Sequence, residues 1–319
     1  MSQTAFLFPG QGSQFVGMGF DLFESFPAAR ARCLAANDVL GYRLTDLMFG
    51  TADGDADAAA DRLKQTKVTQ PALYVHSLAA MAVLEELGLR PDMTAGHSLG
   101  EYSALAAAGA IGFEDGLRIV QRRGALMATA DDGRPGTMAA VLGLDDDAVE
   151  ALCADVSGTD GGVVQAANYN APGQVVISGD VRAVEQALEQ ARARGARRVV
   201  PLPVGGAFHS PLMEEARAGL AEALRTLEIR PPRCPVYLNV TAAPTTDPEE
   251  IRRRLLEQLT APVRWAQILQ RMHADGARRF VEVGAGNVLT GLVRRTLGRD
   301  VDVVAAGTAD ALRALTAPA

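Results

Sequence analysis

The clearest chemical signature in the chain is the G-x-S-x-G pattern of Gly96, Ser98 and Gly100. Residues 90–94 before it are predicted to form a short strand, and residues 101–108 after it are good helix formers. A serine between a strand and a helix, with glycines two residues away on each side, is typical of a nucleophile elbow. The N–H groups at the start of such a helix can stabilise an oxyanion. We therefore predict a serine nucleophile for acyl transfer; the alternative is a Gly/Ser turn without a catalytic role.

A serine nucleophile needs a general base within hydrogen-bonding reach. The chain has four histidines. His76 is expected in the middle of a helix and His273 near a helix end, so both are interpreted as structural or surface residues. His97 precedes Ser98 on the strand side, where successive side chains point to opposite faces, so it is expected to point away from the nucleophile. His209 follows two glycines on a predicted loop, and by elimination it is the candidate base.

A second oxyanion donor is expected from the loop after an early strand. Residues 4–8 form an apolar run that predicts a buried parallel strand, and the Gly-rich turn 9–14 follows it. Neither of the common phosphate-loop patterns occurs there. The backbone N–H of Gln11 is therefore the candidate donor, and a plain turn is the alternative. A hydrolase triad would also contain an acidic residue, for which Asp180 is one candidate among several.

Composition narrows the class of protein. A formal net charge of −7 argues against a general nucleic-acid binder. No apolar run reaches the roughly 18 residues that a membrane span needs, and the N-terminus lacks the basic region of a signal peptide. The three cysteines are too few and too scattered for a disulfide framework or a metal site. We expect a reduced, cytoplasmic protein.

The apolar patterns predict an α/β protein with an insertion. After a linker at 131–136, residues 134–204 follow the order βαββαβ of the ferredoxin-like fold, with a last strand at 197–204. The large domain would then be discontinuous, formed by residues 1–133 and 205–319, with a further strand at 235–240.

Seven motifs connect the chain to a known family. In sequence order they are FPGQGSQ at 8–14, TQPA at 69–72, GHSLGEYSAL at 96–105, QRRG at 121–124, NAPGQVVISG at 170–179, GAFHS at 206–210 and EVGAG at 282–286. This set spans nearly the whole chain and resembles the malonyl-CoA:acyl carrier protein transacylase family, which includes discrete, trans-acting acyltransferases of polyketide synthases. The resemblance implies an α/β-hydrolase-like domain with a parallel central sheet and an inserted ferredoxin-like subdomain.

The resemblance also implies roles for individual residues. Ser98 matches the acylated serine of the family and His209 its general base. The backbone N–H groups of Gln11 and Leu99 match its oxyanion hole. Gln258 matches a glutamine whose backbone carbonyl orients the histidine, which would explain why no acidic triad member stands out.

Two further positions concern the acyl group. Arg123 matches the arginine that binds the free carboxylate of a malonyl group, and a guanidinium can form a two-pronged pair that a lysine cannot copy. Phe208 resembles the malonyl-selecting version of its motif, because its ring would crowd an α-substituent. The pair 205–206 departs from the family, since many relatives have a serine first.

The implied activity is ping-pong transfer of a malonyl group from malonyl-CoA to the phosphopantetheine thiol of an acyl carrier protein, in fatty acid or polyketide biosynthesis. No cofactor or metal is expected, coenzyme A entering as the thioester substrate, and we predict a monomer. Carrier proteins are acidic, so docking needs a local basic patch. The runs 252–254, 278–279 and 294–295 are candidates, or else solvated faces. The alternatives are an acyl-thioester hydrolase and an acyltransferase for another acyl unit; Arg123 favours malonyl transfer.

Overall fold

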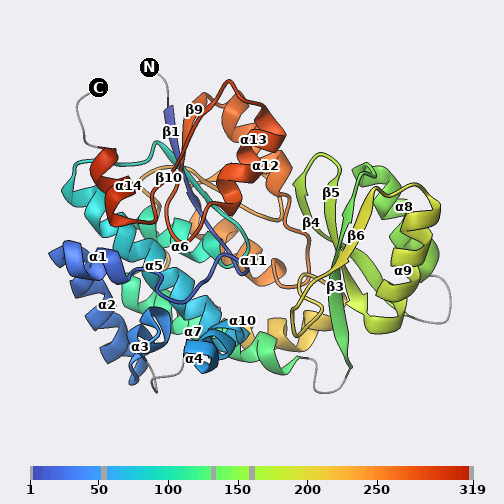
Figure 1. Cartoon of the computed structure of the whole chain (residues 1–319), viewed down its shortest axis with the longest axis horizontal. Coiled ribbons are helices and arrows are strands. Elements are labelled where there is room, and N and C mark those ends of the chain that lie inside the picture. Colours follow the sequence, from blue (N-terminus) through green and yellow to red (C-terminus); the bar gives the residue numbers. More distant parts are fainter. Residues whose placement is uncertain (1–2, 52–55, 131–133, 158–161, 316–319) are drawn as a thin grey trace.

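The structure is a computed structural model that describes residues 3–51, 56–130, 134–157 and 162–315. Residues 131–133 of the predicted linker lie outside this part. Two sheets organise the chain, one in the larger part on the left of Figure 1 and one in the smaller part on the right. Within the described residues, no helix combines the length and apolar character of a membrane-spanning segment.

The larger sheet has six strands in the order β10-β9-β1-β2-β7-β8. Neighbouring strands are parallel except at β8, which pairs antiparallel with β7. The strands are β1 (Gln3–Phe8), β2 (Met93–Gly96), β7 (Val236–Tyr237), β8 (Pro244–Thr245), β9 (Ala277–Glu282) and β10 (Asp302–Ala305). The first strand is central because its residues are apolar enough for both faces to be buried, as expected for a parallel sheet. The predicted α/β class with a parallel central sheet is confirmed.

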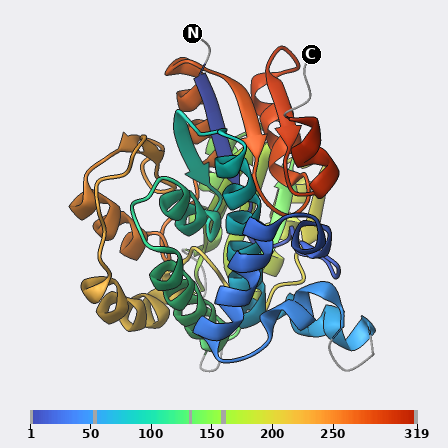
Figure 2. The same ribbon diagram turned by 90° about the vertical axis from the view of Figure 1, so that its left-hand side faces the viewer.

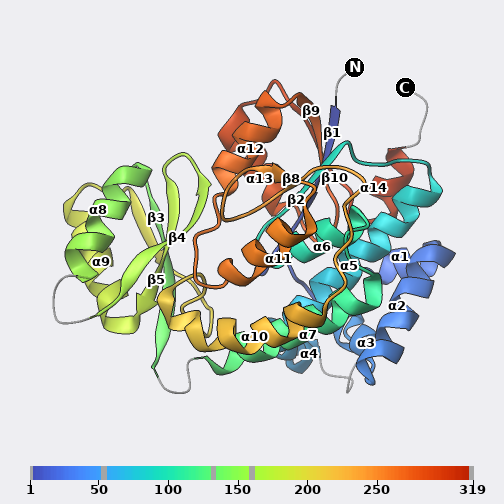
Figure 3. The same ribbon diagram turned by 180° about the vertical axis from the view of Figure 1, so that it is seen from behind.

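Helices cover both faces of this sheet. Figure 2 shows the blue helices of residues 20–49 and the gold-to-orange segment of residues 214–257 on opposite sides of the molecule. From behind, α7 and α10 run along each other at the base of the larger part (Figure 3). The helices are α1 (Phe20–Ser25), α2 (Pro27–Leu40), α3 (Leu44–Phe49), α4 (Ala56–Lys64), α5 (Thr66–Glu86), α6 (Gly100–Ala107), α7 (Phe113–Thr129), α10 (Glu214–Thr226), α11 (Pro248–Glu257), α12 (Trp265–Ala274), α13 (Val288–Leu297), α14 (Ala309–Ala314) and the 3-10 turn η1 (Pro211–Met213).

The smaller sheet is antiparallel, with four strands in the order β4-β5-β3-β6. It contains β3 (Gly136–Leu142), β4 (Val164–Ala171), β5 (Gln174–Asp180) and β6 (Arg198–Pro201), and α8 (Asp146–Ser157) and α9 (Val181–Ala193) pack against it. This is the βαββαβ arrangement of a ferredoxin-like fold. The assignment of residues 134–204 as a separate subdomain, with the large domain split between 1–133 and 205–319, stays a prediction.

A backbone bridge joins the smaller sheet to a loop of the larger part. The N–H of Tyr169 in β4 donates to the carbonyl of Val263 at 2.9 Å, and the N–H of Val263 donates to the carbonyl of Ala167 at 2.9 Å. Residue 263 belongs to the segment between α11 and α12 of the larger part. The bridge therefore fixes the position of β4 next to the loops that carry the site.

Two predicted strands are shorter than expected. The strand predicted at 235–240 ends at Tyr237, because the chain turns back there and Ala242 donates its N–H to the Leu238 carbonyl at 2.9 Å. The strand predicted at 197–204 ends at Pro201. Both departures place residues at the site, since Asn239 lies beneath the serine turn and Leu202 lines the pocket.

Candidate active site

The serine turn connects β2 to α6. Ser98 has a φ of 52°, in the left-handed region that is strained for a residue with a Cβ. Both flanking glycines are required by close backbone approach. A Cβ on Gly96 would lie 1.8 Å from the Gly100 carbonyl oxygen, and one on Gly100 would lie 2.0 Å from that of Phe8. The glycines therefore let the strand, the turn and the helix pack together while Ser98 projects into a pocket.

A histidine and a backbone carbonyl complete the line of hydrogen bonds from the serine. Ser98 Oγ lies 2.8 Å from His209 Nε2, and His209 Nδ1 lies 2.8 Å from the carbonyl oxygen of Gln258. A carbonyl only accepts, so Nδ1 carries the proton and Nε2 is left to accept the proton of Ser98. Asp180, considered above as a triad member, instead accepts from Arg134 and from the Val163 N–H.

Backbone donors near Ser98 divide into occupied and free groups. The Ser98 N–H donates to Asn239 Oδ1 at 2.7 Å, and the Gly12 N–H donates to Gln14 Oε1 at 2.8 Å. Within the described residues, the N–H groups of Gln11 and Leu99 donate to no protein acceptor, and both residues line the pocket. This availability supports their predicted role as an oxyanion hole, which stays a prediction.

Arg123 is a fully buried cation at the floor of the pocket. Its Nη1 donates to Gln70 Oε1 at 3.0 Å, and its Nη2 donates to Gln258 Oε1 at 2.8 Å and to Ser98 Oγ at 3.2 Å. Its contacts are to amide and hydroxyl oxygens, and no carboxylate of the described residues forms an ion pair with it, whereas its neighbour Arg122 is exposed and does not line the pocket. A buried guanidinium without a carboxylate in direct contact is costly, so this arrangement is suited to receiving a carboxylate from a ligand.

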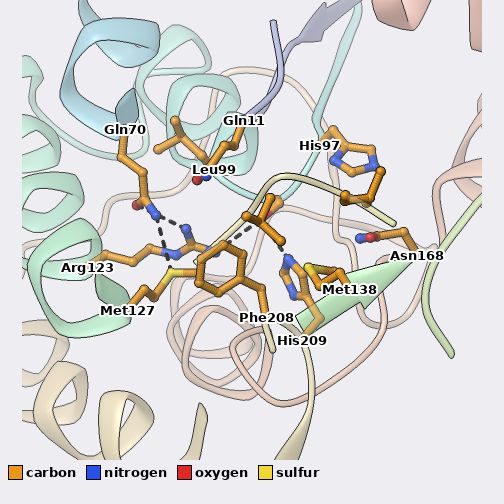
Figure 4. A pocket seen from close by; sticks show the side chains of 13 residues that line it. Gln11, Gln70, His97, Leu99, Arg123, Met127, Met138, Asn168, Phe208 and His209 are labelled. Carbon is orange, nitrogen blue, oxygen red and sulfur yellow. Dashed lines mark hydrogen bonds between the residues drawn. The ribbon is translucent and has the colours of Figure 1, made fainter. Parts of the chain in front are cut away.

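Apolar side chains form the remaining wall. Phe208 is buried beside His209, and Figure 4 shows its ring between Arg123 and His209. Of the predicted site residues, all but Gln258 line this pocket directly, and Gln258 lies behind it in contact with Ser98, Arg123 and His209. The lining residues are Gln11, Gln70, His97, Ser98, Leu99, Arg123, Met127, Met138, Asn168, Leu202, Val204, Phe208 and His209.

The chain matches known proteins over most of its length. A family model described as an acyl transferase domain matches residues 5–313. A "Malonyl CoA-acyl carrier protein transacylase" of Bacillus subtilis (strain 168) is 45% identical over 295 residues, which cover 92% of this chain and 90% of the relative. The chain belongs to the malonyl-CoA:acyl carrier protein transacylase family. It is an acyltransferase by family.

Solved structures of the family have the same fold. An acyl-carrier-protein-S-malonyltransferase from Bartonella henselae superposes with a TM-score of 0.92 at 42% identity, covering 98% of both chains. A malonyl-transacylase in complex with its type II polyketide synthase acyl-carrier protein superposes with a TM-score of 0.91 at 39% identity, again covering 98% of both chains.

From the sequence, no role was predicted for Asn239, Gln70 or Glu101. Asn239 holds the serine turn from below, because its Oδ1 accepts from the Ser98 N–H and its Nδ2 donates to the Gly96 carbonyl at 2.7 Å. Gln70 and Glu101 are buried within helices that are otherwise largely apolar. A polar residue inside an otherwise apolar helix could have indicated these two positions, because a buried polar group needs a hydrogen-bond partner.

The expectation that His97 points away from the nucleophile is wrong. His97 lines the same pocket as Ser98, and its Nε2 lies 2.8 Å from Asn170 Oδ1. The left-handed backbone at Ser98 breaks the alternation of side chains along the strand. His97 still forms no hydrogen bond with Ser98, and His209 alone of the histidines does.

Burial, and secondly the cation of Arg123, lower the pKa of His209 to about 3. In the unfolded chain the pKa of a histidine is near 6.5. Between pH 6.5 and about pH 3 the unfolded chain therefore binds more protons than the folded protein, so the free energy of unfolding falls as the pH falls. From pH 7 to pH 5 this costs about 2 kcal/mol for one histidine. We therefore expect the free energy of unfolding of the natural protein to fall by about that much more than that of His209→Asn, measured with urea at both pH values. Parallel pH profiles would contradict the assignment of His209 as a buried neutral base.

Proposed function

We propose that this acyltransferase moves a malonyl group from malonyl-CoA to the phosphopantetheine thiol of an acyl carrier protein, through an acyl-enzyme on Ser98. One observation carries the proposal. Ser98 Oγ is within hydrogen-bonding distance of a neutral base, His209 Nε2, and of a buried cation, Arg123 Nη2, at 2.8 and 3.2 Å. The base can activate Ser98, and the cation can pair with a carboxylate on the acyl group that Ser98 attacks. The names of the relatives point to the same reaction.

The first half-reaction loads the enzyme. His209 Nε2 takes the proton of Ser98 as Oγ attacks the thioester carbonyl, and the free N–H groups of Gln11 and Leu99 receive the oxyanion. The imidazolium that forms is held by the bond from Nδ1 to the Gln258 carbonyl. Collapse of the intermediate breaks the carbon–sulfur bond, and coenzyme A leaves with the proton from His209.

The second half-reaction repeats these steps with a different nucleophile. The carrier protein's thiol gives its proton to His209 and attacks the malonyl ester, and Ser98 Oγ recovers the proton as it leaves. Arg123 would pair with the malonyl carboxylate throughout and fix the acyl group relative to the nucleophile. No resident cofactor takes part in this scheme, in which coenzyme A enters only as the thioester substrate.

Phe208 closes the apolar side of the pocket next to the base. We infer that its ring limits the space beside the malonyl α-carbon and so favours malonyl over branched units. One such contact supplies about 1–3 kcal/mol of discrimination.

The same proposal includes a docking surface for the carrier protein. Of the candidate basic runs, the arginines at 252–254 pair with glutamates of their own segment, and Arg279 pairs with Asp302. Arg278, Arg294 and Arg295 form no ion pair within the described residues and are the better candidates for an acidic carrier protein. We propose a cytoplasmic monomer that acts on a free carrier protein or on a carrier domain of a polyketide synthase.

Intact-protein mass spectrometry with a panel of acyl-CoAs tests the proposal. Malonyl-CoA is expected to leave one malonyl group on the peptide that carries Ser98, and acetyl-CoA to leave far less of its acyl group. Addition of a carrier protein in its phosphopantetheine form should remove the adduct and yield malonyl-carrier protein. Rapid loss of the adduct to free malonate in the absence of a carrier protein would instead identify an acyl-thioester hydrolase.

A further inference from the structure

One buried acid next to the site takes no part in the steps above. Glu101 lies on α6, one helical turn after Ser98, and its side chain is fully buried. Its Oε2 accepts from the Asn239 N–H at 3.1 Å and from Gln258 Nε2 at 2.8 Å. Its Oε1 forms no hydrogen bond within the described residues. A carboxyl group held in this way at the back of an active site is costly unless it is compensated.

The Gln258 side chain connects this acid to the buried cation. Its Nε2 donates to Glu101 Oε2 and to the Ser98 carbonyl at 3.0 Å, and its Oε1 accepts from Arg123 Nη2 at 2.8 Å. Carboxylates and carbonyls accept these bonds, whereas a guanidinium only donates, so the amide can adopt only this orientation. The result is a continuous chain from the carboxylate through an amide to the guanidinium.

The charges around Glu101 make it the counterpart of Arg123. Burial raises the pKa of Glu101 to about 7. The two hydrogen bonds and the Arg123 cation act in the opposite direction, but their effect is smaller. The other titratable groups here, His97, Tyr102 and His209, are neutral at pH 7, because burial lowers the pKa of both histidines and raises that of the tyrosine. Glu101 is thus the one acidic side chain hydrogen-bonded into this cluster within the described residues.

We propose that Glu101 is the resident counter-charge of Arg123 and limits the preference of the site for acyl groups that carry their own carboxylate. The inference rests on the proposed function. Acylation creates an imidazolium at His209, which a nearby uncompensated cation opposes. With Glu101 ionised, Arg123 is partly compensated even when the acyl group is neutral, as in acetyl. Without this charge, a malonyl group still brings its own anion, but an acetyl group leaves Arg123 uncompensated.

Glu101→Gln tests this proposal with little change of shape. The amide oxygen of the new side chain can accept both hydrogen bonds that Oε2 accepts now, and its NH2 group replaces the unpartnered Oε1, so mainly the charge is removed. Above pH 7, where a carboxyl with a pKa of about 7 is mostly ionised, we expect the ratio of Ser98 acylation rates, malonyl-CoA over acetyl-CoA, to rise about tenfold, mainly through loss of acetyl acylation. In an Arg123→Ala background the same substitution should leave the ratio unchanged.

Glu282→Gln is the matched control. Glu282 is an equally buried carboxylate, whose oxygens accept from the N–H groups of Leu289 and Thr290 at 3.0 and 2.7 Å, at the start of α13. Its replacement should lower the melting temperature without moving the acylation ratio. If Glu101→Gln does not fold, Gln258→Met removes a hydrogen bond that lowers the Glu101 pKa and keeps the backbone carbonyl for His209. The carboxyl then takes up a proton more readily, and a rise in the same direction is expected.

Two outcomes would overturn the inference. One is an unchanged or lower ratio in a folded Glu101→Gln variant, and the other is an equal rise in the Arg123→Ala background. Failure of the proposed function looks different, because the natural protein itself would then take no malonyl group on Ser98.

Discussion

Replacing Ser98 by alanine is expected to abolish the malonyl-enzyme adduct and to lower kcat for malonyl transfer by about 10⁴-fold or more, as in other enzymes that lose a serine nucleophile. Ser98 Oγ is the atom that His209 and Arg123 both approach, so its removal leaves a base and a cation with nothing to activate. The Gln11 and Leu99 donors and Arg123 would remain, so binding of malonyl-CoA should survive. Rapid-quench mass spectrometry measures the adduct, and calorimetry measures the binding.

Ser103→Ala provides the control for this variant. Ser103 is a buried serine on α6, and its Oγ forms no hydrogen bond within the described residues. Its loss should leave both adduct formation and transfer close to those of the natural protein. An adduct that persists in Ser98→Ala and disappears in Ser103→Ala would place the nucleophile elsewhere.

A site residue could be predicted from the sequence where the residues that indicate its role lie close to it in the chain. The nucleophile could be predicted because strand, turn, glycines and helix lie within a few residues of Ser98, and the backbone constraint they share is visible in one motif. His209 was found by elimination among few histidines. The partner of His209 was different, because a backbone carbonyl at Gln258 has no side-chain signature. Only the family resemblance pointed to it.

Asn239 and Glu101 mark the limit of that reasoning. Both act on Ser98 or Gln258 through single hydrogen bonds that join segments far apart in the chain. Asn239 was predicted to lie inside a strand from 235 to 240, and its role depends on the strand ending at Tyr237. That early end is set by a turn whose apolar flanks look like a continued strand. The sequence alone does not show where such a strand ends.

The fold could be predicted from the sequence more fully than these contacts. The alternation of apolar and polar residues in 134–204 predicted βαββαβ, and the strands of the smaller sheet follow it. The parallel arrangement of the larger sheet followed from an apolar first strand buried on both faces. Periodicity could not predict the contact between the smaller sheet and the larger part. The bridge through Val263 involves loop residues that carry no pattern of their own.

Replacing Arg123 by alanine is expected to lower the ratio of malonyl to acetyl acylation by about 100-fold, since a buried, charge-assisted pair contributes roughly 2–5 kcal/mol. The guanidinium is also part of the resting site, where it donates to Gln70 and Gln258. Its loss leaves those amide oxygens unpaired, so some loss of stability should accompany the change in preference. Competition between malonyl-CoA and acetyl-CoA, with both adducts read by mass spectrometry, measures the ratio.

Whether the Arg123→Ala variant stays folded depends on the protonation of Glu101. With the cation gone, one influence that lowers the Glu101 pKa is removed, and the pKa rises further above about 7. The carboxyl then takes up a proton and the site holds no uncompensated buried charge, so we expect a folded protein near neutral pH. Arg122→Ala is the control, because its exposed side chain lies outside the pocket. If both variants keep the malonyl preference of the natural protein, the carboxylate is bound by some other group, and Glu101 has no cation to balance in the reaction.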